Sequence, residues 1–333
     1  MSGLIHGGSD SGPVVLHDFS TNANPLPPPS SLVEALQAAD RRRYPDPQYS
    51  VLRAQLAAAH QLKPAQVLPA AGGAEAIRRI SLAAHLLGVR EVWVPDPGFG
   101  DYAAAAMALG LPLRRYADAA QLLETLQSDA LVWICEPCNP TGASLGSEAL
   151  NAISARAALT VIDRAYEALR LSGTTPLIPS RCWQLHCPNK ALGHTGVRAA
   201  YLLAPSDASP LHQKLHQKLN DLASSWVLSA EGQVLLLQWQ RPEIQAWLVE
   251  SRGQLRSWGL QQRHMLSDLS WQQEDSCTPF WLARPPRDLP AMQILRAHGI
   301  KLRDATSFGL PGWVRIATLP PSSQLALQKV IMQ

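Results

Sequence analysis

One lysine lies where it could carry out covalent chemistry. The chain has six lysines, and only Lys190 falls in a glycine-containing turn, Pro188–Gly193, between two expected strands of one sheet. An amine with the ordinary lysine pKa of about 10.4 is a poor nucleophile, so it needs desolvation or nearby cations such as Arg198. Lys190 is therefore a candidate to bond to a carbonyl-bearing cofactor. The alternative is an ordinary lysine in a surface turn.

Two further polar segments directly follow apolar runs. Glu136–Gly142 comes after one apolar run, and Asp163 comes after the next. A carboxylate at the end of a buried strand is costly as an unpaired anion, so Asp163 should have a cationic partner, and a pyridinium nitrogen would serve. A helix cap or a structural ion pair is the alternative for this residue.

A glycine pair marks a possible phosphate site. Ala71–Glu75 (AGGAE) follows an expected strand and opens an expected helix. Free N–H groups and the positive end of a helix can hold a phosphate, and glycines allow its close approach. A structural turn would need the same glycines, so both interpretations stay open.

The cysteines do not indicate a metal or a disulfide framework. There are five, an odd number, which fits reduced thiols. Cys135 and Cys138 form a C-x-x-C, but no second pair at zinc spacing accompanies them. We therefore expect no metal site.

These residues need a sheet that brings strand ends together. Short apolar runs alternate with helix-like segments from about residue 65 to 205, which predicts an α/β fold with a mainly parallel seven-stranded sheet flanked by helices. Such sheets bind ligands at the carboxyl ends of their strands. The expected strands are Gln66 to Ala70, Glu91 to Val94, Leu113 to Tyr116, Ala130 to Cys135, Leu159 to Ile162, Cys182 to His186 and Ala199 to Leu203.

The rest of the chain divides into an arm and a second domain. Residues 1–29 end in a proline-rich stretch and predict an extended arm over the active site. Residues 30–225 form the expected large domain, and residues 226–333 a smaller α+β domain. Leu211 to Leu222 and Trp226 to Val249 are expected to be helical.

Composition excludes several classes of protein. The chain has 333 residues, 46% of them hydrophobic, and a net charge of +3, which is too small to indicate a nucleic-acid surface. No apolar stretch approaches the ~18 residues of a membrane-spanning helix, and the first residues lack a signal-peptide pattern. We expect a cytoplasmic protein without nucleic-acid or membrane partners.

Together the motifs resemble those of fold-type I pyridoxal-phosphate enzymes, in the branch of histidinol-phosphate aminotransferase and threonine-phosphate decarboxylase. The resemblance covers nearly the whole chain and implies an aspartate aminotransferase-like fold and pyridoxal 5'-phosphate as cofactor. The motifs are DFSTNANPLPPP (Asp18–Pro29), YPDP (Tyr44–Pro47), AGGAEAI (Ala71–Ile77), PDPGFGDY (Pro95–Tyr102), EPCNPTG (Glu136–Gly142), DRAY (Asp163–Tyr166), NKALGHTGVR (Asn189–Arg198) and WVRIA (Trp313–Ala317).

The resemblance assigns roles around the cofactor ring. It implies that Lys190 is the Schiff-base lysine and that Asp163 keeps the pyridine nitrogen protonated, so that the ring can accept electrons. Asn139 and Tyr166 would hydrogen-bond the ring hydroxyl, and Phe99 would stack on the ring. Lys190, Asp163 and Tyr166 are the expected catalytic residues.

It also assigns residues to the anionic groups. Gly73, Ala74 and Arg198 would bind the cofactor phosphate, and Tyr44 would reach it from the other subunit of a homodimer with shared active sites. Arg315 would bind the substrate carboxylate through a bidentate pair.

Three positions depart from the family pattern. Cys187 and Asn189 stand where relatives usually have hydroxyl residues, and Arg164 replaces the usual glutamate. A sulfur donor holds phosphate less well than a hydroxyl does, so Cys187 bears on cofactor affinity.

Two segments favour the decarboxylase within this branch. His6-Gly7-Gly8 is similar to the opening HGG of threonine-phosphate decarboxylases, and Leu302–Leu310 is similar to an RDCSSF-like stretch of the cobalamin-pathway enzymes. The resemblance implies that His6 and Arg303 bind the substrate phosphate. The other expected substrate-binding residues are Gly7, Asn22, Asn139 and Arg315. A disordered N-terminus is the alternative for His6.

The implied reaction is decarboxylation of L-threonine O-3-phosphate to (R)-1-aminopropan-2-yl phosphate in cobalamin biosynthesis. The alternative is an aminotransferase for histidinol phosphate or a related phosphorylated amine. A protein that binds pyridoxal phosphate without catalysis is a third interpretation, because of Cys187 and Arg164.

Overall fold

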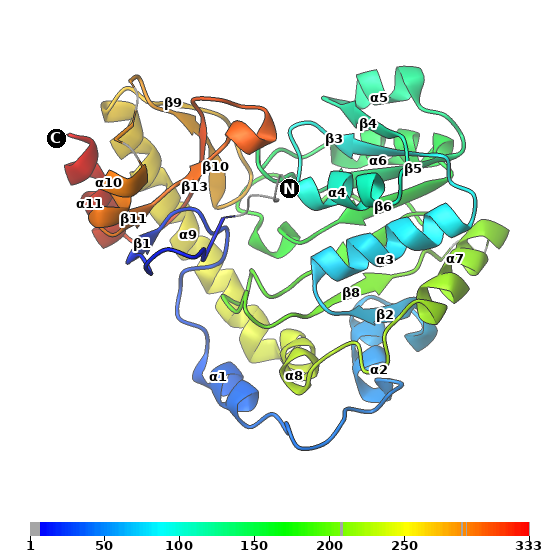
Figure 1. Ribbon diagram of the computed structural model, residues 1–333. Coiled ribbons are helices and arrows are strands. Elements are labelled where there is room, and N and C mark those ends of the chain that lie inside the picture. The colour runs from blue at the N-terminus through cyan, green and yellow to red at the C-terminus, as the bar shows by residue number, and fades with distance from the viewer. Residues whose placement is uncertain (1–6, 207–208, 288, 291, 333) are drawn as a thin grey trace.

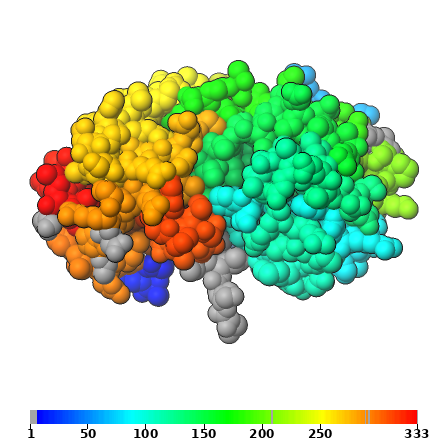
Figure 2. Space-filling model, turned by 90° about the horizontal axis from the view of Figure 1, so that it is seen from above, coloured from blue at the N-terminus to red at the C-terminus, as the bar shows by residue number. Residues whose placement is uncertain are grey.

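Two lobes make up the molecule, and one long helix connects them (Figure 1). The structure is a computed structural model that describes residues 7–206, 209–287, 289–290 and 292–332. Helix α9 (Pro242–Asp268) runs from the large lobe into the small one. Seen from above, the two lobes lie against each other along the middle of the molecule (Figure 2).

The large lobe is built on a seven-stranded sheet in the order β2-β8-β7-β6-β5-β3-β4. All neighbouring pairs are parallel except the two that β8 makes with β7 and β2. This confirms the predicted mainly parallel sheet of seven strands. The strands are β2 (Val67–Ala70), β3 (Glu91–Pro95), β4 (Leu113–Tyr116), β5 (Ala130–Cys135), β6 (Leu159–Asp163), β7 (Trp183–His186) and β8 (Ala200–Leu203).

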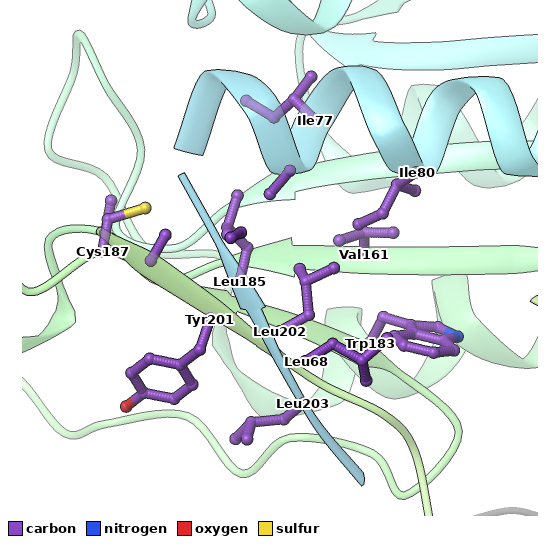
Figure 3. Close-up of a cluster of buried hydrophobic side chains, with 14 of the residues drawn as sticks. Leu68, Ile77, Ile80, Val161, Trp183, Leu185, Cys187, Tyr201, Leu202 and Leu203 are labelled. Atoms are coloured by element: carbon purple, nitrogen blue, oxygen red, sulfur yellow. The ribbon is translucent and has the colours of Figure 1, made fainter. Parts of the chain in front are cut away.

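Helices cover both faces of this sheet, which explains why its central strands are apolar throughout. Every residue of β5 is buried. Leu131 and Trp133 belong to the core that includes Ile77 of α3 (Gly73–Leu86), whereas Val132 and Ile134 pack on the other face. Figure 3 shows Ile77 on α3 and Val161, Leu185 and Leu202 on the strands beneath it, all members of this core. Strands buried on both faces lose the alternation of polar and apolar residues.

One of the expected helices differs in the structure. The expected helix Trp226 to Val249 is divided, because Pro242 lacks an N–H and begins α9 at its first turn. The other helices are α1 (Ser30–Gln37), α2 (Ser50–Ala59), α3 (Gly73–Leu86), α4 (Gly100–Ala108), α5 (Ala119–Thr125), α6 (Gly146–Arg156), α7 (Pro210–Asp221), α8 (Ala230–Trp239), α10 (Met292–Ala297) and α11 (Pro321–Ile331).

The small lobe holds an antiparallel sheet in the order β12-β13-β10-β9. Its strands are β9 (Gln272–Gln273), β10 (Phe280–Arg284), β12 (Arg303–Asp304) and β13 (Val314–Ala317). The arm contributes to this lobe, because β1 (His17–Asp18) pairs with β11 (Ile300–Lys301). The expected domain boundary at residue 226 precedes α8, yet α8 packs into the core of the large lobe. The change of core occurs within α9, between Leu255 and Leu266.

Among the described helices, none has the length and apolar character that a membrane crossing requires.

Candidate active site

A cavity of about 480 Å³ lies at the carboxyl ends of the central strands. The large lobe, the arm and strand β13 of the small lobe all contribute to its wall. Because β2 and β5 to β7 end at this edge and β8 begins there, loops that are distant in sequence meet. Eleven of the predicted site residues line it: Gly7, Asn22, Gly73, Ala74, Phe99, Asn139, Asp163, Tyr166, Lys190, Arg198 and Arg315.

Asp163 ends β6 as a buried carboxylate. Its Oδ2 accepts a hydrogen bond from the Tyr102 hydroxyl at 2.7 Å, and its Oδ1 accepts one from the N–H of Ala165 at 2.9 Å. Burial raises the pKa of Asp163, while the bond from Tyr102 and the charge of Lys190 oppose this shift. A buried carboxylate held on both oxygens is a fixed partner for a cation in the cavity.

Lys190 faces the same cavity from the loop after β7. Its Nζ lies 5.0 Å from the centroid of the Tyr166 ring. Burial by itself would lower the pKa of Lys190, but the Tyr166, Cys187 and Asp163 groups outweigh burial, so the pKa is raised. Burial thus acts in the expected direction, but the acidic neighbours together dominate the pKa of Lys190.

Aromatic rings surround the space between Asp163 and Lys190. Phe99 precedes α4 and meets Tyr102 edge-on, with ring centroids 5.6 Å apart. Tyr166 follows β6 and packs edge-on against Phe280 of β10, at 4.8 Å. These contacts fix the aromatic rings at the carboxyl ends of the strands, where a planar ligand ring could stack on Phe99.

The N-terminus of α3 has the geometry and charge to hold an anion. Gly72 has a φ of +93°, and a Cβ at this position would lie 2.5 Å from Nη2 of Arg198. The first N–H groups of α3, at Gly73 and Ala74, have no partners within the helix, and the helix dipole favours an anion there. Burial raises the pKa of the Cys187 thiol to about 12, so this group stays neutral beside the anion site.

Arg315 projects from β13 and is buried. Its Nη1 donates to Oδ1 of Asn139 at 2.7 Å, and its Nη2 donates to the Ser20 carbonyl of the arm at 2.5 Å. Burial lowers the pKa of Arg315 to about 10, and the charge of Arg303 acts in the same direction, but the guanidinium stays charged at neutral pH. Arg315 therefore connects the small lobe, the large lobe and the arm at the cavity.

The arm packs so closely on Arg315 that a side chain is excluded. A Cβ on Gly7 would lie 1.9 Å from the Ser20 carbonyl and 2.8 Å from Nη2 of Arg315, so only glycine fits. Asp10 fastens the same segment to the small lobe through Arg296 and Lys301, each at 2.6 Å. The arm thus forms part of the cavity wall.

Several buried polar atoms in the wall lack partners among the described residues. They are both amide atoms of Asn22, Oδ1 of Asn189 and Nε of Arg315. Unpaired buried polar atoms are costly, so a polar ligand would relieve them. The cavity also offers a carboxylate for a ring nitrogen, a lysine for a carbonyl, an aromatic face and a helix N-terminus for a phosphate. The residues present therefore fit pyridoxal phosphate.

Two of the predicted residues that the structure describes, Arg303 and Tyr44, do not line the cavity. Arg303 lies on β12 in register with Arg315, is buried, and donates to Oγ of Ser307 at 2.6 Å. Tyr44 is exposed and stacks on Trp226, with centroids 4.2 Å apart. His6 lies outside the described residues.

Sequence reasoning missed Tyr102. Its motif was recognised, but its role depends on how α4 packs against the sheet: the ring stacks on Trp133 at 5.0 Å and brings the hydroxyl to Asp163. The available signal was its position three residues after Phe99, in the first turn of a helix.

Comparison with known proteins gives consistent results. The family model for aminotransferase class I and II matches residues 15–331. The chain is 29% identical over 319 residues to histidinol-phosphate aminotransferase from Halorubrum lacusprofundi, covering 90% of this chain and 84% of that protein. It is 30% identical over 249 residues to threonine-phosphate decarboxylase from Salmonella typhimurium, covering 69% and 67%. The crystal structure of histidinol-phosphate aminotransferase from Sinorhizobium meliloti in complex with pyridoxal-5'-phosphate is similar with a TM-score of 0.75 at 20% identity, covering 93% and 88%.

Proposed function

The chain belongs to the class I and II aminotransferase family and uses pyridoxal 5'-phosphate, and from this premise we propose that it decarboxylates L-threonine O-3-phosphate to (R)-1-aminopropan-2-yl phosphate. We assign this reaction to cobalamin biosynthesis because Leu302–Leu310 is similar to a stretch of the cobalamin-pathway enzymes.

The observation that carries this proposal is a pair of buried arginines. Arg303 and Arg315 are partners on neighbouring antiparallel strands, and both guanidinium groups lie over the Phe308 ring, at 4.7 and 6.0 Å. Cross-strand partners have Cα atoms about 4.5–5.5 Å apart. Two adjacent cations suit one small substrate with two nearby anionic groups. Threonine phosphate has a carboxylate and a phosphate on neighbouring carbons, whereas histidinol phosphate has no carboxylate.

In this proposal Arg315 holds the substrate carboxylate and Arg303 holds its phosphate. Asn22 and Gly7 of the arm close the site and exclude water, and Asn139 orients the Arg315 guanidinium through the 2.7 Å bond. Charge-assisted bonds from arginine to carboxylate or phosphate are strong and directional. The substrate is thereby fixed at both anionic ends.

Asp163 and Lys190 carry the chemistry. The bound cofactor supplies an electron sink for the pair that remains when the bond between Cα and the carboxylate breaks. Asp163 keeps the proton on the ring nitrogen. A cation at Asp163 also offsets the negative charge that helps to raise the pKa of Lys190, which frees the amine for bonding to the carbonyl. Lys190 then delivers the proton that replaces CO2 at Cα.

The cofactor phosphate would bind Gly73, Ala74 and Arg198 at the start of α3. We also propose a homodimer with shared sites, in which Tyr44 of one copy reaches this phosphate in the other. Tyr44 and Trp226 form an exposed aromatic pair, with 77% and 41% of their surfaces accessible. Aromatic groups of this kind on a surface are typical of a contact between proteins.

An aminotransferase is the second candidate, and one observation favours it. The histidinol-phosphate aminotransferase relative is matched over 90% of this chain, against 69% for the decarboxylase relative. The same Lys190 would then move the proton to the cofactor instead of to Cα.

Two substrates assayed side by side separate these functions. The holoenzyme is given L-threonine O-3-phosphate, or histidinol phosphate with 2-oxoglutarate, and CO2, aminopropanol phosphate and glutamate are measured. We expect CO2 and aminopropanol phosphate from the first substrate and no glutamate from the second. Glutamate formation without CO2 release would overturn the decarboxylase and favour the aminotransferase.

A further inference from the structure

A second cavity, of about 510 Å³, lies on the face of the large sheet that is opposite α3. In β7 and β8, His186 is opposite Tyr201 and Leu185 is opposite Leu202. Leu185 and Cys187 face α3, because a Cβ on Gly73 would contact both. Since side chains alternate along a strand, His186 and Tyr201 face away from α3. Figure 3 shows the Cys187 sulfur on the side of α3 and the Tyr201 ring on the other side.

The wall of this second cavity is rich in arginine. Arg164 and Arg170 come from the segment after β6, and Arg252 and Arg256 come from α9. Glu167 is the one acidic residue among those that line it. The cavity therefore has an excess of positive charge.

Only one of these arginines has its charge neutralised by close carboxylates. Arg170 contacts Glu136 at 2.7 Å and Glu167 at 3.0 Å. Arg164 reaches Glu167 only at 4.0 Å. For Arg252 and Arg256, no ion pair occurs within the described part of the chain. Three guanidinium groups are thus left for an anion.

These three groups have unused hydrogen-bond donors. Arg164 donates from Nη1 to Oε1 of Gln184 at 3.1 Å, and its Nε is buried with no partner among the residues that the structure describes. Arg252 and Arg256 each donate from Nη1 to one backbone carbonyl, at 3.1 and 3.3 Å. A guanidinium has five N–H donors, so most remain for a ligand.

Two histidines and a tryptophan of the wall are uncharged. Burial, followed by the charge of Arg164, lowers the pKa of His60 to about 4, and the same effects together with His60 lower that of His186. Both rings are therefore neutral at physiological pH and can only hydrogen-bond. Trp239 provides an apolar surface in the same cavity.

We propose that this second cavity binds a small phosphate-bearing anion, either a phosphate monoester or inorganic phosphate. Arg164 lies deep in the wall, with 14% of its side chain exposed, Arg252 is half-buried, and Arg256 is exposed. A dianion would neutralise adjacent guanidinium groups and pair with the unused Nε of Arg164. The remaining volume accommodates an organic group against Trp239. Arg252 and Arg256 also hold the loop after β6 through its backbone carbonyls. That structural role alone would leave the buried Nε of Arg164 without a partner.

Calorimetric titration with inorganic phosphate tests this site in holoenzyme saturated with pyridoxal phosphate, at constant ionic strength. We expect saturable binding that is weakened at least tenfold by Arg164→Gln and by Arg256→Gln, because each removes charge-assisted bonds. Arg90→Gln is the matched control: it removes one arginine that is 84% exposed and lies in a surface pair with Asp129. Arg303→Gln tests the anion site beside the active site. Both of these variants should bind phosphate at the second cavity as the wild type does.

Three results would overturn the proposal. They are absence of saturable binding in the millimolar range, an affinity of Arg164→Gln and Arg256→Gln equal to that of the wild type, and loss of all binding in Arg303→Gln. Circular dichroism and cofactor absorbance verify that each variant is folded. If Arg164→Gln does not fold, Arg256→Gln decides the outcome, because this exposed residue gives up only one bond, to the carbonyl of Leu171. The proposal does not depend on which reaction the enzyme catalyses.

Discussion

Replacing Arg303 with glutamine tests how the substrate phosphate is recognised. The side chain is buried, so solvent screens its charge little, and it lies beside the Arg315 guanidinium over the Phe308 ring. Each charge-assisted hydrogen bond to the phosphate contributes about 1.5–3 kcal/mol. Loss of one such bond should reduce kcat/KM for L-threonine O-3-phosphate roughly ten- to a hundredfold, mainly through KM.

The substitution also has structural effects, and these should be small. Glutamine loses the bond from Arg303 to Oγ of Ser307 at 2.6 Å and the bond to the Asp304 carbonyl at 2.5 Å. It also removes a like charge that lowers the pKa of Arg315. Arg284→Gln is a matched control, because it removes an exposed arginine from the same small-lobe sheet.

The assay compares two substrates that differ only in the phosphate. Decarboxylation of L-threonine O-3-phosphate and of L-threonine is followed by CO2 release in the wild type, Arg303→Gln and Arg284→Gln. Plain threonine should respond little to Arg303→Gln, because it lacks the group that this residue binds. Equal losses on both substrates would show that Arg303 maintains the structure of the site and does not bind the phosphate.

Four further substitutions test the remaining roles. Lys190→Ala should abolish the visible absorbance of the holoenzyme, and borohydride followed by peptide mass spectrometry should place the cofactor on Lys190 in the wild type; a label on another lysine would refute the assignment. Asp163→Asn should retain cofactor but lose at least a hundredfold in kcat, because an amide cannot hold the proton on the ring nitrogen; near-normal turnover would make Asp163 merely structural. Cys187→Ser should tighten cofactor binding by up to about tenfold in Kd, since a hydroxyl is a better donor than a neutral thiol, whereas an unchanged Kd measured by fluorescence titration would exclude contact with the phosphate. Inactive Tyr44→Ala and Lys190→Ala proteins, mixed so that subunits exchange, should regain part of the activity in hybrid dimers, and an active monomer by light scattering would contradict shared sites.

The strands could be predicted from the sequence for a physical reason. Ala130–Cys135 and Leu159–Asp163 are buried on both faces, so each is a short continuous apolar run with a polar segment after it. The order of the strands in the sheet could not be predicted, because the pairing of β8 with β2 joins segments that are more than 120 residues apart. The long interlobe helix was misjudged where Pro242 interrupts an otherwise helical pattern.

The site was predictable to the extent that it follows strand ends. Asp163 comes directly after an apolar run and Lys190 lies in the loop after the next strand, and the topology brings such positions to one edge. Tyr102 and the raised pKa of Lys190 depend on side chains that meet only in the folded protein. The second cavity could not be predicted from the sequence either, because Arg164 and Arg252 come together only when α9 packs on the sheet.

The most direct test of the proposed decarboxylation follows the bond between Cα and the carboxylate and the proton that replaces CO2. The holoenzyme is incubated in D2O with L-threonine O-3-phosphate labelled in its carboxyl carbon, and the gas and the products are analysed by mass spectrometry. The proposed decarboxylation predicts labelled CO2 in equal amount with aminopropanol phosphate that carries one deuterium on the carbon that lost the carboxylate, with neither formed by Lys190→Ala. Retention of the label in an oxo acid, with the amino group transferred to 2-oxoglutarate, would contradict it.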